Sequence, residues 1–308
     1  MQTVLITGGT GLVGKKLCGY LLEKKYNVII LSRNPGTHQQ EPGLRYAGWD
    51  INSGKIDIKA VQEADFIIHL AGAPVMEKRW TAAYKKEIAD SRIKSSLLLA
   101  DTLQNNPHHV QSIISSSAIG WYGPDKNTKH AFVESDPPAA DFLGQTCLQW
   151  EESIERAEQH NVRVCKLRTG IVLAEKGGAL EEFIKPLNFG VATILGNGKQ
   201  VISWIHVDDL CNMFHHVMTN SLRGSYNAVA PEPVSNKKLV LSLAKLIKKN
   251  AYIPVHVPTA ALKLILGERS IEILKSATVS SQKIIDAGFT FRYPDIDSAL
   301  LEITENIR

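Results

Sequence analysis

Three glycines at a fixed spacing follow the first apolar run of the chain. The stretch VLITGGTGLVGKKL places Gly8, Gly11 and Gly14 between a β-type run and an amphipathic segment. Gly8 permits a tight turn, Gly11 lets backbone approach a pyrophosphate, and Gly14 lets a helix pack closely on the sheet. The N–H groups at the start of that helix attract phosphate. The pattern predicts a dinucleotide site made by Thr7, Gly8, Gly11, Leu12, Val13 and Gly14, against the alternative of a merely structural glycine turn.

The second apolar run, NVIILSRNP, ends at Ser32 and Arg33. NAD-preferring proteins carry an acidic residue at this place, which accepts a hydrogen bond from the ribose 2′-hydroxyl and would repel a 2′-phosphate. Arginine instead offers a planar fork that pairs with phosphate and can stack on adenine. Ser32 and Arg33 therefore predict NADP(H) as the cofactor. The alternative is that Arg33 is a solvated surface residue.

Aromatic and polar residues later in the chain suit a substrate wall. Aromatic rings with one basic residue favour a sugar or an anionic ring. Ordinary packing between lobes is the alternative for each residue, and a hydrogen-bonded structural role is the alternative for the histidine. The candidate substrate residues are Trp80, Lys199, Gln200, Trp204 and His206.

The elements that must position these residues follow from the hydrophobic pattern. Apolar runs alternate with helix-like stretches such as 12–24 and 82–103, and the runs are nearly continuous in hydrophobicity, as in strands buried on both faces. This alternation predicts an α/β fold with a Rossmann-type, doubly wound parallel sheet. The expected strands are 4–7, 28–31, 66–70, 112–115 and 162–167.

After Leu173 the rhythm changes, and from Asn236 onward the chain is mostly helical in pattern. We expect a cofactor-binding domain over 1–173, to which 201–229 returns. A smaller, discontinuous and mostly helical C-terminal substrate lobe is expected over 174–200 and 230–308.

Composition excludes several classes of function. The chain has 308 residues and a formal net charge of +4, with no run of five basic residues, so nucleic acid is not indicated. No apolar run is long enough to span a bilayer, and the opening VLIT is too short for a signal peptide. The four cysteines lack metal-type spacing. Buried thiols in a reducing compartment are expected, which predicts a cytoplasmic protein without a metal site.

Further segments carry a family resemblance. The chain contains ADFIIHLAG, SSSAIGWYG, LRTGIVL and WIHVDDL in this order, after a GxxGxxG turn. It resembles the extended branch of the short-chain dehydrogenase/reductase superfamily, with its NAD-dependent epimerases and dehydratases. Details such as DFL…WE and the helical C-terminal module are similar to a subgroup of epimerase-like proteins sometimes named as cell-division-inhibitor homologues. The resemblance covers nearly the whole chain.

The resemblance implies contacts with the cofactor and with a small-molecule substrate. Leu70, Ala71 and Gly72 would line the sugar and diphosphate, and Ile171 would pass near the nicotinamide. Glu87 and Arg92 are expected near the cofactor, although their spacing alone indicates a solvated charge pair. Extended members often form dimers through a helix pair, which leaves room for a homodimer here.

The resemblance also shows what is missing. Members usually carry a tyrosine and, four residues later on the same helix, a lysine, which together move the hydroxyl proton during hydride transfer. Counting back from Glu151 gives Cys147 and Leu143 at those places, and 139–158 contains neither tyrosine nor lysine. Ser117 takes the place of the family's catalytic serine, with Ser116 as the alternative, unless these serines only cap a strand end.

Two functions in different classes remain open. In the first, the protein is an NADP(H)-dependent reductase or epimerase, an oxidoreductase or isomerase whose unconventional proton relay uses Ser117, Tyr122 or water. In the second, it is a non-catalytic protein that senses NADP(H). The loss of the pair at Leu143 and Cys147 favours the second, and the retained substrate-wall features favour the first.

Overall fold

The computed structural model describes residues 1–125 and 130–305, and it confirms the predicted Rossmann-type α/β architecture. In this part of the chain, eight strands form the main sheet, and neighbouring strands run parallel except for β3 and β4. In spatial order the strands are β12 (Gly224–Ala228), β7 (Arg163–Thr169), β6 (Ser112–Ala118), β5 (Phe66–His69), β1 (Thr3–Thr7), β2 (Asn27–Ser32), β3 (Leu44–Asp50) and β4 (Lys55–Ile56).

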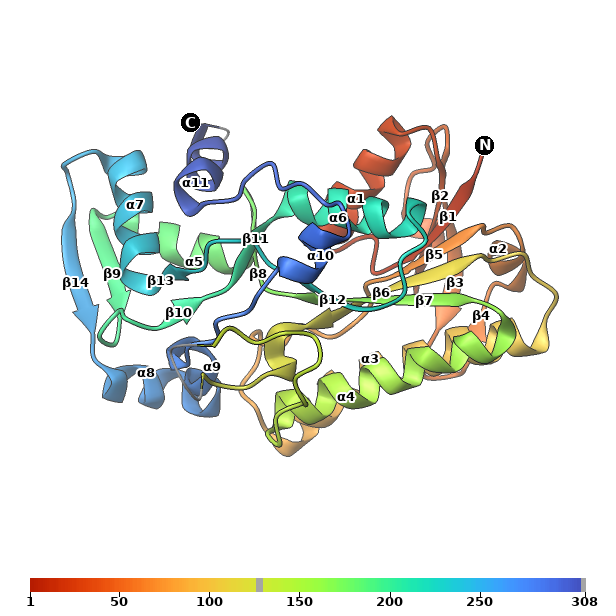
Figure 1. Cartoon of the computed structure of the whole chain (residues 1–308), viewed down its shortest axis with the longest axis horizontal. Coiled ribbons are helices and arrows are strands. Elements are labelled where there is room, and N and C mark those ends of the chain that lie inside the picture. Colours follow the sequence, from red (N-terminus) through yellow and green to blue (C-terminus); the bar gives the residue numbers. More distant parts are fainter. Residues whose placement is uncertain (126–129, 306–308) are drawn as a thin grey trace.

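Helices cover both faces of this sheet, as Figure 1 shows. Alternate residues of β1 supply both cores: Val4 and Ile6 face one layer, and Leu5 faces the other. The first layer is made by α1 (Leu12–Glu23) and α6 (Val207–Thr219), and the second by α2 (Ile58–Gln62), α3 (Ala82–Asn105), α4 (Phe142–Glu155) and η3 (Arg156–His160). Burial on both faces explains why the strand runs are almost wholly apolar.

Side-chain caps fix the start of the two long helices next to the site. The hydroxyl of Thr81 accepts a hydrogen bond from the N–H of Tyr84 at the start of α3. The carboxylate of Asp141 accepts one from the N–H of Gly144 at the start of α4. Such caps satisfy N–H groups that the helix cannot bond internally. They therefore set where Phe142 and Leu143, the first residues of α4, enter the structure.

A second lobe has its own core, which includes Leu180, Ala192, Leu243 and Leu300. Two strands that we did not predict, β9 and β14, pair in parallel within it. Its elements are α5 (Gly178–Leu187), β9 (Val191–Leu195), β10 (Val201–Ile202), β13 (Val234–Ser235), α7 (Asn236–Lys248), β14 (Ile253–Val257), α8 (Thr259–Leu266), η4 (Gly267–Arg269), α9 (Ser270–Leu274) and α11 (Ile296–Glu305).

The chain passes between the lobes at more points than the sequence indicated. Strand β8 (Ile171–Leu173) pairs with β11 (Trp204–His206), outside the main sheet. Trp204 packs in the core of the second lobe, whereas Ile284 of α10 (Gln282–Asp286) and Phe289 pack in the core of the main lobe. The segment around 284–289 therefore ties the end of the chain back to the main sheet (Figure 1).

The length and hydrophobicity of the helices decide whether any of them could cross a membrane. Within residues 1–125 and 130–305, no helix combines the length and the apolar character that a bilayer span requires. Two short 3-10 turns complete the described elements, η1 (Pro35–Thr37) and η2 (Ile119–Trp121).

Candidate functional site

The site lies where the strand order reverses, at the carboxyl ends of β1 and β5. Strand β1 leads to β2 on one side, whereas β5 lies on its other side, and open α/β sheets bind ligands in the crevice at such a point. A groove of about 830 Å³ occupies it. The groove is lined by the glycine turn, the ends of β2 and β3, the loop after β5 and the first half of α3.

The glycine turn is shaped as its spacing predicted. Gly8 has a φ of +69°, and a Cβ added there would lie 2.9 Å from the carbonyl carbon of Leu70. A Cβ at Gly14 would lie 2.3 Å from the carbonyl oxygen of Gly8. Gly11 precedes α1 and provides no side-chain cap, so the N-terminus of this helix remains available to an anion. Leu12 is exposed beside Gly177 and Gly178, and Val13 packs on the core.

Thr7 lies beneath the groove and holds the backbone of two residues that line it. Its side chain is fully buried, and its Oγ1 accepts hydrogen bonds from the N–H groups of Leu70 and Ala71, both at 3.1 Å. We infer that its own hydroxyl donates to Nδ1 of His69, at 2.7 Å, which leaves the proton of neutral His69 on Nε2. Burial, reinforced by the charge of Arg92, lowers the pKa of His69 to about 3. Thr7 therefore positions Leu70 and Ala71, which line the groove.

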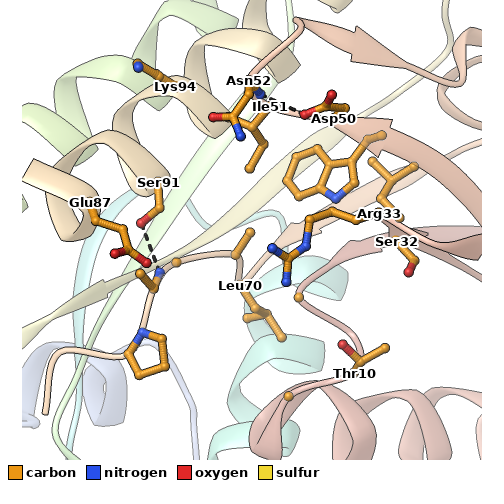
Figure 2. Close-up of a pocket in the computed structure, with 18 of the residues that line it drawn as sticks. Thr10, Ser32, Arg33, Asp50, Ile51, Asn52, Leu70, Glu87, Ser91 and Lys94 are labelled. Carbon is orange, nitrogen blue, oxygen red and sulfur yellow. Dashed lines mark hydrogen bonds between the residues drawn. The ribbon is translucent and has the colours of Figure 1, made fainter. Parts of the chain in front are cut away.

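Arg33 extends from the end of β2 into the groove, across from Leu70 (Figure 2). It is exposed, and no carboxylate within the described ranges forms an ion pair with it. The Ser32 hydroxyl lies 3.1 Å from Nε2 of His38 and accepts a hydrogen bond from the N–H of Asn34. The structure thus presents a free guanidinium and a hydroxyl at one end of the groove.

The end of β3 supplies a part of the site that our sequence reasoning missed. Trp49, Asp50, Ile51 and Asn52 line the groove beside Arg33. The hydroxyl of Ser53 donates to Asp50, and together with the N–H of Asn52 it lowers the pKa of that carboxyl. The signal was available: β3 pairs with β2 in parallel, so its carboxyl end must lie at the same edge as Arg33.

Helix α3 closes the opposite side of the groove. The Ser91 hydroxyl accepts a hydrogen bond from the N–H of Ala73, at 2.9 Å, and Nη1 of Arg92 donates to the carbonyl oxygen of the same residue, at 3.0 Å. Burial lowers the pKa of Arg92. A Cβ at Gly72 would lie 2.9 Å from the guanidinium carbon of Arg92. Glu87 is exposed, lines the groove and lies 3.7 Å from Nζ of Lys78.

Comparison with known proteins agrees with this geometry. The sequence model of the NAD dependent epimerase/dehydratase family matches residues 4–228. The chain belongs to this family. A second model, a domain of unknown function named DUF1731, matches residues 257–303, the helical module at the end of the chain.

Relatives cover the chain almost from end to end. Epimerase family protein SSP1921 of Staphylococcus saprophyticus is 34% identical over 98% of this chain and 99% of its own length. A protein of Arabidopsis thaliana named Epimerase family protein SDR39U1 homolog, chloroplastic, is 33% identical over 99% of this chain and 87% of its own. The crystal structure of human epimerase family protein SDR39U1 with NADPH is similar with a TM-score of 0.86 and 27% identity, covering 99% of this chain and 100% of that one.

The places where the family resemblance puts the missing tyrosine and lysine lie on α4, close to the end of β6, in what we call the β6–α4 corner. A Cβ at Gly120, just after β6, would lie 3.3 Å from Cβ of Leu143 and 3.8 Å from Sγ of Cys147. These side chains therefore face the end of β6, but they bring no hydroxyl and no cation. Burial raises the pKa of the Cys147 thiol to about 12.

Ser117 and Tyr122, our catalytic candidates, face a buried network instead of the groove. The Ser117 hydroxyl donates to Glu151, at 2.6 Å, and Arg168 donates to both oxygens of that carboxylate, at 2.8 and 3.0 Å. Burial opposes the charge of Arg168, yet these bonds outweigh it and raise its pKa. Tyr122 donates to Oδ1 of Asn227, at 2.6 Å, and burial raises its pKa to about 12. A catalytic tyrosine needs a lowered pKa, so the placement argues against the catalytic assignment.

The candidate substrate residues and Ile171 do not come together around the groove. Trp204 is fully buried, the buried Gln200 donates to the carbonyl oxygen of Leu195, and His206 lies 2.9 Å from Glu302, with burial lowering its pKa. All three side chains are buried and make contacts within the protein, which argues against a substrate role. Lys199 is exposed, Ile171 is 41% exposed beyond the end of β7, and neither lines the groove. Trp80 is half-buried, and it follows the part of the loop after β5 that lines the groove.

Proposed function

We propose that the groove binds NADP(H) and that the protein is an NADP(H)-dependent reductase- or epimerase-like enzyme acting on a small molecule. The observation that carries the proposal is the unpaired guanidinium of Arg33 at the end of β2, where NAD-preferring proteins hold an acid. Ser32 and Arg33 would hold the 2′-phosphate. The relative human protein whose structure contains NADPH supports the same cofactor.

The residues of the groove fit such a ligand. The glycine turn leaves no room for a Cβ at Gly8 or Gly14, which brings the backbone close to the start of α1. That helix, from Leu12 onward, has no side-chain cap of its own, so its N–H groups would meet the diphosphate. Leu70, Ala71 and Gly72 would line the sugars, with Glu87 toward the nicotinamide half. Arg92 and Ile171 do not line the groove, and by the family resemblance they would approach the nicotinamide half from outside its lining. The end of β3, from Trp49 to Asn52, would border the adenine.

When bound, the cofactor supplies hydride chemistry. The residues around it would bind and orient the substrate, but the described part of the β6–α4 corner offers only Leu143 and Cys147 where the family's acid and cation stand. Water is therefore the proton source that the geometry supports.

A charge-reversal variant tests the cofactor assignment. Arg33→Asp should weaken NADPH by about tenfold to a hundredfold, the effect of losing a charge-assisted contact worth ~1.5–3 kcal/mol, and should weaken NADH far less. Calorimetric titration of both dinucleotides measures this. Arg45→Asp is the matched control, because Arg45 is a half-exposed arginine that pairs with Glu63 outside the groove. Equal losses for NADPH and NADH, or no NADPH binding to the native protein, would show the assignment wrong.

A second measurement separates an enzyme from a sensor. Stopped-flow absorbance of bound NADPH, mixed with a pool of cell metabolites, should show oxidation with at least one compound. A protein that binds NADPH tightly but never oxidises it in the presence of any fraction of the pool would be the NADP(H)-sensing protein instead.

A further inference from the structure

A group of apolar side chains lies beyond the groove, past the part of the loop after β5 that lines it. The groove lining from the loop after β5 ends at Pro74, Glu77 and Lys78, and the loop then continues to Trp80 just before α3. Nε1 of Trp80 donates to the carbonyl oxygen of Val75, at 2.8 Å, which folds the loop back on itself. The indole meets the ring of Phe142 edge to face, with ring centroids 5.3 Å apart.

This apolar group continues to the end of β6. Phe142 and Leu143 are the first two residues of α4, and Leu143 faces Gly120 beyond β6. Trp80, Phe142 and Leu143, which we call the apolar wall, are all half-buried, so each keeps part of its surface available. The adenosine end of the groove is at β2 and β3, and the sheet order β3-β2-β1-β5-β6 places the wall at the opposite end.

Among the residues that the structure describes, three cations near the wall are already engaged. Nζ of Lys85 lies 5.8 Å from the Trp80 ring centre and 5.3 Å from that of Phe142, but it is held by Glu268 at 2.5 Å. Arg79 donates to the carbonyl oxygen of Leu264, at 3.1 Å. Arg269 donates to that of Met76, at 2.6 Å. A nucleotide sugar carries a diphosphate that would require such groups to be free, so this surface favours a ligand without phosphate.

Leu143, where the family resemblance places a tyrosine, also limits which hydride acceptors suit the site. Hydride addition to an isolated carbonyl leaves a localised, strongly basic alkoxide, which is why a positioned acid is needed. Hydride addition to a quinone leaves a hydroquinone monoanion whose charge is spread over the ring. One proton from water then completes the reduction, while NADPH is oxidised to NADP⁺. Leu143 in place of the acid therefore favours the second reaction over the first.

We propose that the apolar wall binds a flat, conjugated and uncharged hydride acceptor of the quinone class. This inference rests on the proposed function, because the acceptor needs NADPH as the reductant. The rings of Trp80 and Phe142 present the apolar surface, and Leu143 removes the polar group that would otherwise face the acceptor's carbonyl. Stacking of aromatic surfaces supplies the affinity.

Binding of tetramethyl-p-benzoquinone to the protein saturated with NADP⁺ tests the proposal without turnover. This quinone has no free ring position for a thiol to attack, so the four cysteines do not react with it. Calorimetry should detect binding, and Phe142→Ala should weaken it roughly tenfold. NADP⁺ affinity should stay unchanged. Trp80→Phe, which keeps a ring, should weaken the quinone less than Phe142→Ala, and unchanged NADP⁺ affinity in both variants shows that they fold.

Phe189→Ala is the matched control, because Phe189 is 89% exposed in the second lobe and lies outside the wall. It should leave quinone affinity unchanged. If NADP⁺ binds but the quinone does not, or if UDP-glucose binds at the wall in its place, the acceptor class is wrong and the proposed function stands. If NADP⁺ itself does not bind, both proposals fall.

Discussion

The cofactor groove and the β6–α4 corner lie along the same edge of the sheet, yet the polar groups of the groove are open to a ligand and those of the corner are buried. In the groove, Arg33 and Glu87 point toward open space. At the corner, Ser117, Glu151 and Arg168 satisfy one another inside the protein. Buried polar groups that are fully paired stabilise a fold but offer nothing to a ligand.

Under the proposed function, this difference would allow a family member to keep a cofactor site without the usual tyrosine and lysine. The groove depends largely on backbone and on few side chains. The corner depends on two side chains, and their replacement by Leu143 and Cys147 makes it hydrophobic. The neighbouring ionic groups then serve the fold, which gives the two regions different responses to substitution.

Removal of Glu151 should produce the largest effect. Its carboxylate is 5% exposed and accepts from Arg168, whose side chain is 4% exposed, so Glu151→Ala leaves a buried guanidinium without a counter-charge. Breaking such a pair costs about 3–5 kcal/mol in free energy of unfolding. Urea denaturation measures the loss. NADPH affinity of the folded fraction should change less than about twofold.

The neighbouring Glu152 provides the matched control, because it is exposed on the same helix. Glu152→Ala should change the free energy of unfolding by less than about 0.5 kcal/mol. A large loss of NADPH affinity in Glu151→Ala, with little loss of stability, would break the comparison and place Glu151 in the site.

The next effect is a pH dependence that belongs to the groove side. His69 stays neutral in the fold, with a pKa of about 3 against an ordinary 6.5. Between these values the unfolded chain binds the proton and the folded chain does not, so stability is present above pH 6.5 and is lost as the pH falls. The contribution to the slope is up to about 1.4 kcal/mol per pH unit.

His69→Asn should therefore flatten the decline of stability between about pH 6.5 and pH 5, where few carboxylates titrate. Denaturation at several pH values measures the slope, which separates this effect from any constant loss caused by the substitution. His109→Asn is the control, since His109 is exposed. An unchanged slope in the His69 variant would show that His69 is charged in the fold.

The fold was largely predictable because its signals are local. The strands at 4–7, 28–31 and 66–70 are apolar throughout, and the structure contains all of them. Strands β3, β9 and β14 escaped prediction for a physical reason. Each carries polar or partly exposed side chains, as in RYAGWD, so its pairing with a neighbour decides its conformation more than its own sequence does.

The site was predictable only where a local sequence motif specifies it. The glycine turn and Arg33 follow from spacing and strand order. The directions of Ser117 and Tyr122 do not, because Glu151 and Asn227 are their partners only in three dimensions. Trp204 and His206 were misplaced for the same reason: a pattern places a residue on a strand but does not show which lobe covers it.

A smaller effect comes from Ser117 itself. Ser117→Ala removes one donor to Glu151, which keeps its bonds to Arg168 and Ser225, so the free energy of unfolding should fall by about 1–2 kcal/mol. NADPH affinity should not move. Ser116→Ala is the control, because the Ser116 hydroxyl has no hydrogen bond within residues 1–125 and 130–305. A fall in NADPH oxidation at constant affinity and stability would restore Ser117 as a catalytic serine.

Cys147 gives the smallest expected signal and the sharpest test of the corner. A thiol attacks a reagent as the thiolate, and burial raises the pKa of Cys147 to about 12, as it does for Cys18, Cys165 and Cys211. A mild thiol reagent at about pH 8 should therefore label Cys147 no faster than the protein unfolds, and NADPH should slow all four thiols alike. Peptide mapping by mass spectrometry distinguishes them. Fast labelling of Cys147 alone, blocked by NADPH, would mean that the corner is open to the nicotinamide and that its thiol belongs to the site, because only a reachable thiolate reacts so selectively.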